Sequence, residues 1–357
     1  MIYFDSAATT MQKPPEVFQA VRRAERFGGA GRGGHEAAMN AAAAIYDCRE
    51  LACKLFGASS PERVILTSNA THALNIAIKS LVNPQKAVIT SGYEHNAVMR
   101  PIHALGVRHI IADDFGSALE TTDAGLVVCS HVSNVFGTVL PVSHIAELCK
   151  RRGVPLIIDA SQSAGVLPLD AEALQAVLCM PGHKGLYGPQ GTGLLIAPSN
   201  IDLCSLIEGG TGSASLSYDM PKNLPDLLEA GTQNAWGAAG LSEGLKFVTR
   251  QTPQGIMEHE QKLLSEALKT EIDGVNLFKS ENQAGVLSMT FRNHDAEAIA
   301  ATLSDHGIAV RAGLQCAPLA HKTMGTAPLG TLRASFSIFN TTNEVRTFQK
   351  TLKAIVT

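Results

Sequence analysis

Met180-Pro181-Gly182-His183-Lys184-Gly185 is the stretch that decides how the fold is interpreted. It ends the apolar run Ala176 to Met180, which is typical of a buried strand, and it places a lysine beside a histidine between two glycines. A lysine at the end of a buried strand, on flexible backbone, is a candidate for Schiff-base chemistry with a carbonyl cofactor. The alternative is an exposed lysine in an ordinary turn, because loops commonly carry lysines.

Short apolar runs alternate with helical patterns from Arg63 to Ala197. The predicted strands are 64–67, 87–90, 110–112, 126–129, 155–158, 176–180 and 193–197, and the helices between them include 71–82, 96–105 and 145–152. This alternation predicts an α/β fold with a mostly parallel sheet covered on both faces. Ligands of such sheets bind beyond the carboxyl ends of the strands, so the residues after each run are the candidates for chemistry.

The two ends of the chain have a different pattern. Helices are predicted at 14–27 and 38–56, and after Asn234 at 236–250, 255–270, 296–306 and 343–355, with strands at 286–291, 308–310 and 332–336. The second group indicates a smaller α+β unit. Gly29, Gly31 and Gly34 form a Gly-x-Gly-x-x-Gly pattern, but it follows a helix instead of a strand, which argues against dinucleotide binding.

Composition limits the class of protein and its partners. A length of 357 residues suggests two domains, or one large domain with an appendage, and a net charge of −3 gives no electrostatic case for nucleic acid or an anionic membrane. The first residues have no basic start and no apolar signal core, so no secretion signal is expected, and no apolar run reaches the ~18 residues of a membrane span. The seven cysteines form no Cys-x-x-Cys pair, which favours reduced thiols of a cytoplasmic protein over disulfides or a zinc site.

Polar residues follow five of the predicted strands. Thr71 begins a helix, which favours a phosphate site, although an ordinary helix cap is the alternative. His95 suits stacking on an aromatic cofactor or a structural hydrogen bond. Asp159 at the end of a buried strand needs a positive partner, such as a protonated heterocycle. With Asn134 and Lys184, these residues predict one polar site at the edge of the sheet.

The chain resembles class V aminotransferase-type, fold type I pyridoxal-phosphate (PLP) enzymes, in the cysteine desulfurase and selenocysteine lyase branch. The matching stretches run in family order over essentially the whole chain: Tyr3-Phe4-Asp5-Ser6-Ala7-Ala8-Thr9-Thr10, Arg32-Gly33-Gly34-His35, Glu94-His95-Asn96, His131 to Gly137, Asp159 to Ser163, Gly182-His183-Lys184, Glu229-Ala230-Gly231-Thr232, Arg311 to Cys316 and Leu332 to Ser335. The resemblance implies a large PLP-binding domain, residues 13–244, with a seven-stranded sheet. It also implies a small α+β domain, residues 1–12 and 245–357, that carries Cys316 and Arg333.

The resemblance also implies roles for individual residues. Lys184 would bond PLP covalently and move the substrate Cα proton, Asp159 would pair with the pyridine nitrogen, and His95 would stack on the ring. Gln162 would bond the ring hydroxyl oxygen. The implied cofactor-binding residues are Ala70, Thr71, His95, Asn134, Asp159, Gln162, His183, Lys184 and Thr232, the last from the partner subunit of a homodimer. The implied substrate-binding residues are Arg333, Asn134, His35 and Arg311, and the implied catalytic residues are Lys184, Cys316 and His95.

Cys316 determines which reaction is implied. In the short-loop group of the family, a cysteine here attacks the substrate sulfur of L-cysteine, leaving alanine and a persulfide that passes to an acceptor protein. A thiolate is required, and Arg311 is the nearest cation in sequence. The alternatives are a selenocysteine lyase or cysteine sulfinate desulfinase, a PLP aminotransferase, or an inactive scaffold with Cys316 as a spectator thiol.

The chain departs from the family pattern at two places. Pro181 stands where a phosphate-binding hydroxyl residue is common, so the phosphate site would depend on Thr71, His183 and the glycine-rich segment Gly209 to Gly212. Leu314-Gln315 precedes Cys316, where the family often has histidine.

Overall fold

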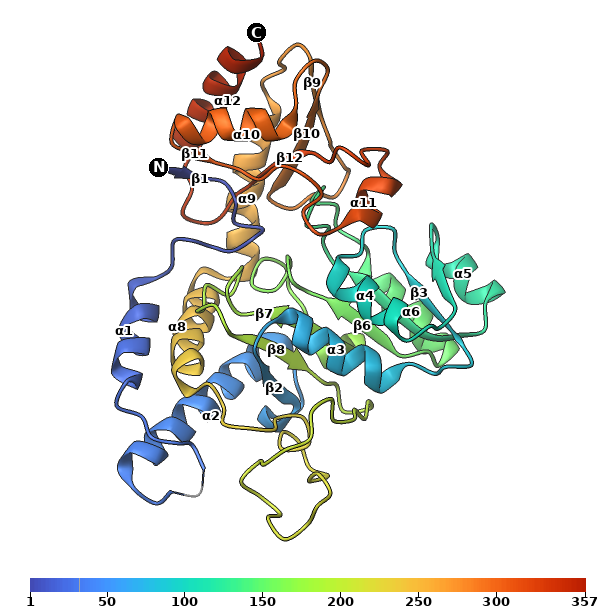
Figure 1. Cartoon of the computed structure of the whole chain (residues 1–357), viewed down its shortest axis with the longest axis vertical. Helices are drawn as coiled ribbons and strands as arrows, with labels where there is room; N and C mark the ends of the chain where they lie inside the picture. Colours follow the sequence, from blue (N-terminus) through green and yellow to red (C-terminus); the bar gives the residue numbers. More distant parts are fainter. Residues whose placement is uncertain (32) are drawn as a thin grey trace.

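The computed structural model describes residues 1–31 and 33–357; Arg32, the first residue of the Arg32–His35 motif, lies outside the described residues. A seven-stranded sheet forms the centre of the larger unit (Figure 1), in the order β2-β8-β7-β6-β5-β3-β4. Its strands are β2 (Val64–Thr67), β3 (Ala87–Thr90), β4 (His109–Ile111), β5 (Ala124–Ser130), β6 (Leu156–Asp159), β7 (Ala176–Pro181) and β8 (Gly193–Ile196). Only β8 runs antiparallel to its neighbours. The predicted α/β class with a mostly parallel seven-stranded sheet is confirmed.

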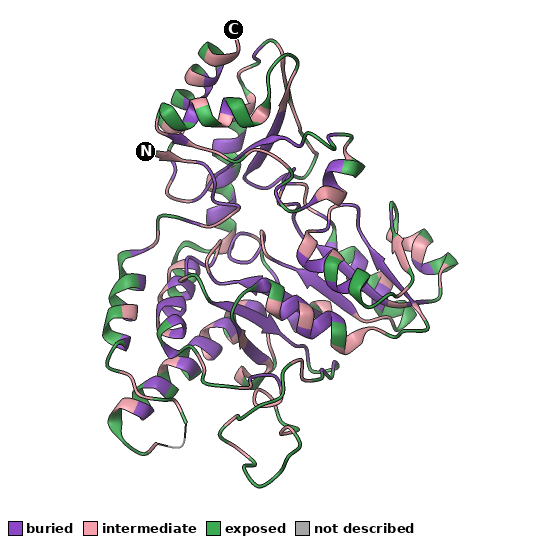
Figure 2. Ribbon diagram, in the orientation of Figure 1, coloured by how far each residue is buried: buried purple, intermediate pink, exposed green. Residues whose placement is uncertain are grey.

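Both faces of this sheet are covered by helices, which explains its continuous apolar runs. Consecutive residues of β5 point to opposite faces: Val127 and Cys129 belong to one apolar cluster and Val128 to another. The helices of the larger unit are α1 (Pro15–Ala24), α2 (Glu36–Phe56), α3 (Ala70–Leu81), α4 (Asn96–Ala104), α5 (Phe115–Thr121), α6 (Val142–Arg152), α7 (Ala171–Leu174) and α8 (Ala235–Gln251), and a 3-10 turn, η1, spans Pro61–Arg63. Figure 2 shows the buried sheet between partly exposed helices.

The C-terminal segments form a second, smaller core. It contains β9 (Val275–Leu277), β10 (Val286–Phe291) and β12 (Leu332–Ser335) in one antiparallel sheet, with α9 (Pro253–Leu268), α10 (Ala296–Asp305) and α12 (Thr342–Val356). Helix α11 (Pro318–Thr323) instead packs through Ala320 against Val135 and Phe136. The N-terminus joins this core, because β1 (Ile2–Tyr3) pairs with β11 (Ile308–Ala309). Phe4 packs edge-on against Phe336 and Phe348, with ring centroids 5.1 and 5.8 Å apart. Both termini therefore lie at the same end of the molecule (Figure 1).

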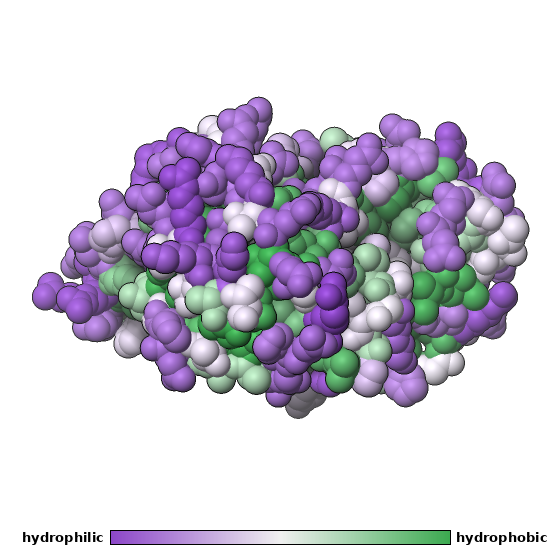
Figure 3. Space-filling model, turned by 90° about the horizontal axis from the view of Figure 1, so that it is seen from above, coloured by the Kyte–Doolittle hydropathy of each residue, from purple (hydrophilic) through white to green (hydrophobic). Residues whose placement is uncertain are grey.

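The predicted domain boundaries at 12/13 and 244/245 stay a prediction. Helix α8 continues through residue 244 to Gln251, and the chain turns at Thr252, which has φ 61°. Viewed from the end that carries the termini, mostly hydrophilic side chains surround smaller apolar patches (Figure 3). Of the helices that the structure describes, none has the length and apolar character needed to cross a membrane.

The sequence patterns missed several of the short elements, although β4 and β11 were predicted. Helices α5, α7 and α11 have seven, four and six residues, and β9 has three. Such segments are too short to show a hydrophobic period. The long elements were predicted to within about three residues of their ends, as expected from caps such as Gly57, which ends α2 at φ 62°.

Candidate active site

A cavity of about 220 Å³ lies at the carboxyl ends of the parallel strands. Of the residues predicted from the sequence, it is lined by Ala70, Thr71, His95, Asn134, Asp159, Gln162, His183 and Lys184. These residues follow β2, β3, β5, β6 and β7, which are adjacent or nearly adjacent in the sheet. The strand ends that the sequence singled out thus surround one cavity.

Lys184 follows β7 and is held through its backbone by the N-terminal segment. The Thr10 N–H donates to the His183 carbonyl at 3.1 Å, and the Thr10 hydroxyl donates to the Lys184 carbonyl at 3.2 Å. Burial lowers the pKa of the Lys184 ammonium to about 8, against an opposing effect of Asp159. The unprotonated, nucleophilic form of the amine is therefore far more populated near neutral pH than for an ordinary lysine.

Asp159 and His95 present a carboxylate and a neutral imidazole to the cavity. Asp159 is buried and accepts the Ser161 N–H at 2.9 Å. His95 caps α4 by accepting the Ala97 N–H at its Nδ1, 3.0 Å away, which places the ring proton on Nε2. Burial lowers the pKa of His95, while Asp159 raises it. Asp159 remains available for a cationic partner.

The start of α3 and His183 supply groups suited to an oxyanion. Ala70 and Thr71 are the first residues of α3, whose N–H groups lack acceptors within the helix, and both residues line the cavity. His183 contacts the Thr9 hydroxyl through Nδ1 at 3.0 Å, and burial lowers its pKa to about 4, so the ring is neutral. Pro181 also lines the cavity and offers no donor.

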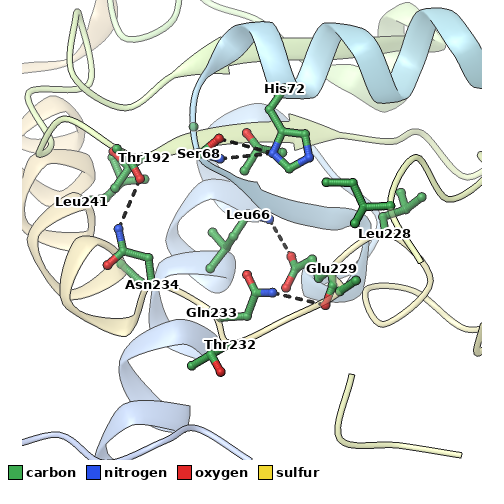
Figure 4. Close-up of a pocket in the computed structure, with 16 residues that line it drawn as sticks. Leu66, Ser68, His72, Thr192, Leu228, Glu229, Thr232, Gln233, Asn234 and Leu241 are labelled. Carbon is green, nitrogen blue, oxygen red and sulfur yellow. Dashed lines mark hydrogen bonds between the residues drawn. The ribbon is translucent and has the colours of Figure 1, made fainter. Parts of the chain in front are cut away.

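Thr232 lies elsewhere in the chain. It lines a second cavity of about 200 Å³ with Ser68, His72 and Glu229 (Figure 4). The glycine-rich segment 209–212 stays near Thr232, since the Gly231 N–H donates to the Gly210 carbonyl at 2.7 Å. Within one subunit, neither Thr232 nor this segment lines the cavity around Lys184.

His35 and Arg333 also lie outside the lining of this cavity. His35 is exposed and caps α2, accepting the Ala38 N–H at 3.3 Å. Arg333 is 1% exposed, on β12, and donates to the Asn134 carbonyl at 2.8 Å. Its Nε is buried without a hydrogen-bond partner among the described residues. Through Asn134, Arg333 contacts the wall of the cavity, and its spare donor suits an anionic ligand group.

Asp5 is a charged residue of this region that the sequence reasoning did not assign. It accepts Arg333 Nη2 at 2.8 Å and Arg311 Nη2 at 2.7 Å. It therefore balances both cations, and Arg311 is bound to Asp5 rather than free beside Cys316. The one available signal was its position in the N-terminal stretch that carries the resemblance.

The Cys316 loop docks on the rim of the cavity. The Cys316 carbonyl accepts the Asn96 N–H at 2.8 Å, and the Gln315 carbonyl accepts the Asn134 side-chain amide at 2.8 Å. Cys316 is exposed, and it lies close enough to Lys184 for a thiolate to raise the pKa of that lysine. The structure therefore brings a free thiol and a buried amine to the same site.

The donor set of the cavity fits PLP. Lys184 is an amine suited to the aldehyde, Asp159 a carboxylate suited to a protonated ring nitrogen, and the start of α3 an anion site for the phosphate. Thr71 adds a hydroxyl there, and the neutral His183 adds a ring N–H.

Residues 2–348 match the aminotransferase class-V family. The chain belongs to this family, whose members use PLP. A probable cysteine desulfurase of Methanothermobacter thermautotrophicus is 31% identical over 99% of this chain and 94% of its own length. A cysteine desulfurase of Escherichia coli O157:H7 is 30% identical over 97% of this chain and 91% of its own length.

One further relative is longer than this chain, and the structure of another has been solved. The chain spans 55% of a probable cysteine desulfurase of Mycolicibacterium paratuberculosis, at 31% identity over 99% of this chain. Among solved structures, the apo cysteine desulfurase of Thermococcus onnurineus superposes with a TM-score of 0.91 and 29% identity, covering 99% of this chain and 94% of that one. The likeness agrees with the sheet order and the small antiparallel sheet described above.

Proposed function

We propose that this chain is a PLP-dependent cysteine desulfurase. L-Cysteine and the Cys316 thiol would give L-alanine and a persulfide on Cys316. The substrate C–S bond breaks and an S–S bond forms, so the substrate sulfur is oxidised while its carbon is reduced and protonated. The atoms and electrons balance without an external oxidant or reductant. The persulfide would then pass to an acceptor protein.

The docking of the Cys316 loop is the observation that supports this reaction best. Asn96 and Asn134 hold the backbone of residues 315 and 316 at the rim of the cavity that contains Lys184. A lyase or transaminase reaction needs the lysine but not a thiol at this position. A nucleophilic thiol placed beside the amine is what sulfur transfer requires.

The residues of the cavity have separable tasks in this proposal. PLP, when bound, supplies the electron sink that weakens bonds at the substrate Cα. Lys184 would bind the cofactor covalently and hold or release the Cα proton at Nζ, and Asp159 would keep the ring nitrogen protonated. His95, Gln162 and Asn134 would hold the ring in the cavity. Arg333, with the exposed guanidinium of Arg311, binds the substrate carboxylate.

A homodimer completes the phosphate site in this proposal. Thr232 lies outside the Lys184 cavity of its own chain, so it would act in the cavity of the partner subunit. His35 stays a candidate substrate-binding residue. The free cysteines of the described chain favour a reducing, cytoplasmic location.

The test is incubation of the PLP-loaded protein with L-cysteine. Alanine is measured by chromatography, and persulfide at each cysteine by peptide mass spectrometry. We expect alanine and a persulfide confined to Cys316, with both lost in Cys316→Ala. Cys204→Ala is the matched control, because Cys204 is also exposed and free. Undiminished turnover of cysteine in Cys316→Ala would exclude transfer of the substrate sulfur to Cys316.

The same experiment separates the alternatives. Alanine from selenocysteine or cysteine sulfinate that persists in Cys316→Ala marks a lyase or desulfinase. A keto acid marks a transaminase. A protein that acquires no visible absorption with PLP, in wild type as in Lys184→Ala, marks an inactive scaffold.

A further inference from the structure

The Cys316 loop has a backbone conformation that needs external support. Gln315 and Cys316 have φ of 41° and 57°, a left-handed conformation that is strained for non-glycine residues. The two residues are consecutive, and Cys316 is exposed, so its own side chain contributes little packing. Contacts made by the neighbouring residues must hold this turn in place.

Gln315 makes such contacts with a buried side chain. Its amide Nε2 donates to the Thr331 carbonyl at 2.8 Å, and its Oε1 lies 3.0 Å from Nε2 of His321. Because a carbonyl only accepts, the Thr331 contact fixes which end of the amide faces His321. Gln315 is 9% exposed, so these bonds form away from water, where an unpaired amide is costly.

His321 completes the cluster from α11. It is fully buried, and its Nδ1 lies 2.7 Å from the Thr326 hydroxyl. Gln315 Oε1 only accepts, so the ring proton is on Nε2 and the Thr326 hydroxyl donates to Nδ1. Phe136 packs on the ring at 5.7 Å between centroids. Both nitrogens are engaged, and the imidazole is fixed in one tautomer.

We infer that Gln315 and His321 form a buried clamp that holds Cys316 on the rim of the Lys184 cavity. The clamp anchors the Gln315 side chain, while Asn96 and Asn134 donate hydrogen bonds to the backbone carbonyls of Cys316 and Gln315. Both clamp residues are positioning residues: they act on sulfur transfer through Cys316 and do not touch the substrate. This assignment rests on the proposed function for its catalytic consequence, but the clamp itself is independent of it.

Amide hydrogen exchange at Asn96 reports the clamp directly. Asn96 is the first residue of α4, so its N–H has no acceptor within the helix and bonds to the Cys316 carbonyl. The full-length, PLP-loaded variants to test are Gln315→Met and His321→Phe. We expect Asn96 to exchange about tenfold faster in each, as loss of a buried hydrogen bond implies. If they form one clamp, the double variant is less than additive.

A matched control distinguishes the clamp from a general loss of stability. Gln349 is 8% exposed and donates to the carbonyls of Glu266 and Ala267, so Gln349→Met removes comparable bonds at a site remote in the fold. It should leave Asn96 unchanged. Thr326→Val removes only the hydroxyl that donates to Nδ1 of His321. It is the variant to test if Gln315→Met and His321→Phe fail to fold.

The functional measurement is persulfide formation at Cys316 with L-cysteine, alongside the dissociation constant of PLP. We expect kcat to fall about tenfold with KM and the PLP constant unchanged. Unchanged Asn96 exchange in the folded variants would refute the clamp. Faster exchange with a wild-type rate at Cys316 would refute its role in sulfur transfer. If Asn96 exchanges faster in the variants but even the wild-type protein forms no persulfide, the clamp is upheld and the proposed function is refuted instead.

Discussion

Replacing Asp5 with asparagine tests the charge balance at the junction of the two cores. The Asp5 carboxylate is 7% exposed and accepts from Nε and Nη2 of Arg311 and from Nη2 of Arg333. Asparagine preserves the shape and one acceptor oxygen but removes the negative charge. Arg333, which is 1% exposed, would then be a buried cation without a counter-ion.

The expected cost follows from the exposure of the two arginines. Arg311 is half exposed, with 49% of its side chain accessible, so water screens its pair with Asp5 and its loss costs at most ~1 kcal/mol. Breaking a buried pair costs about 3–5 kcal/mol, because the remaining charge is uncompensated. The retained acceptor oxygen places Asp5→Asn at the lower end, at about 3 kcal/mol in the free energy of unfolding, or several degrees in Tm.

Thermal and urea unfolding of the full chain, followed by circular dichroism, measures this change. Asp273→Asn is the matched control, because Asp273 pairs with Arg292 at 3.6 Å while both side chains remain largely exposed. That variant should differ from wild type by less than ~0.5 kcal/mol. An Asp5→Asn protein as stable as Asp273→Asn would show that Arg333 does not depend on Asp5, and the reasoning would be wrong.

Three further predictions concern proton and cofactor binding. The rate at which apoprotein captures PLP, followed by visible absorbance, should rise with pH around a midpoint near 8, because burial lowers the pKa of Lys184 to about 8 and only the free amine reacts; a midpoint near 10 would contradict this. Burial raises the pKa of Glu260 to about 8, so the folded state keeps a proton that the unfolded state loses, and stability should decline between pH 4.5 and 8. In Glu260→Gln that decline should be smaller. At pH 9 the variant should exceed wild type in free energy of unfolding by on the order of 3 kcal/mol, which urea unfolding detects. Mixed dimers of Lys184→Ala and Thr232→Ala subunits should regain wild-type PLP affinity at one site, whereas a subunit that uses its own Thr232 would show no recovery.

The general position of the site could be predicted from the sequence because one rule of sheet geometry links residues far apart. Parallel strands end at one edge, so the residues after each buried run must lie near each other. Asp159 and Lys184 were found in this way without any contact information, and both line the cavity. The single antiparallel strand β8 leaves this rule intact, since its carboxyl end faces the other way and contributes none of the predicted residues.

The support of the site could not be predicted in the same way. Asp5 and Arg333 are 328 positions apart, and nothing in local periodicity states that one neutralises the other. Gln315 and His321 are six positions apart, but one lies in a left-handed turn and the other on a six-residue helix. The partner of a buried polar group is decided by packing, which hydrophobic patterns do not encode.

The N-terminal segment links the groups that this support must align. Asp5 bridges to Ser335 on β12 and bonds Arg333, so residues 2–5 belong to the smaller core. Five residues later, Thr10 bonds the backbone of Lys184 at the end of β7. The intervening Ala7 donates its N–H to the Ser335 hydroxyl and accepts the Gln162 amide, at 2.9 Å each. One short stretch therefore sets the distance between the buried arginine of the smaller core and the lysine of the large sheet, since it is hydrogen-bonded to both.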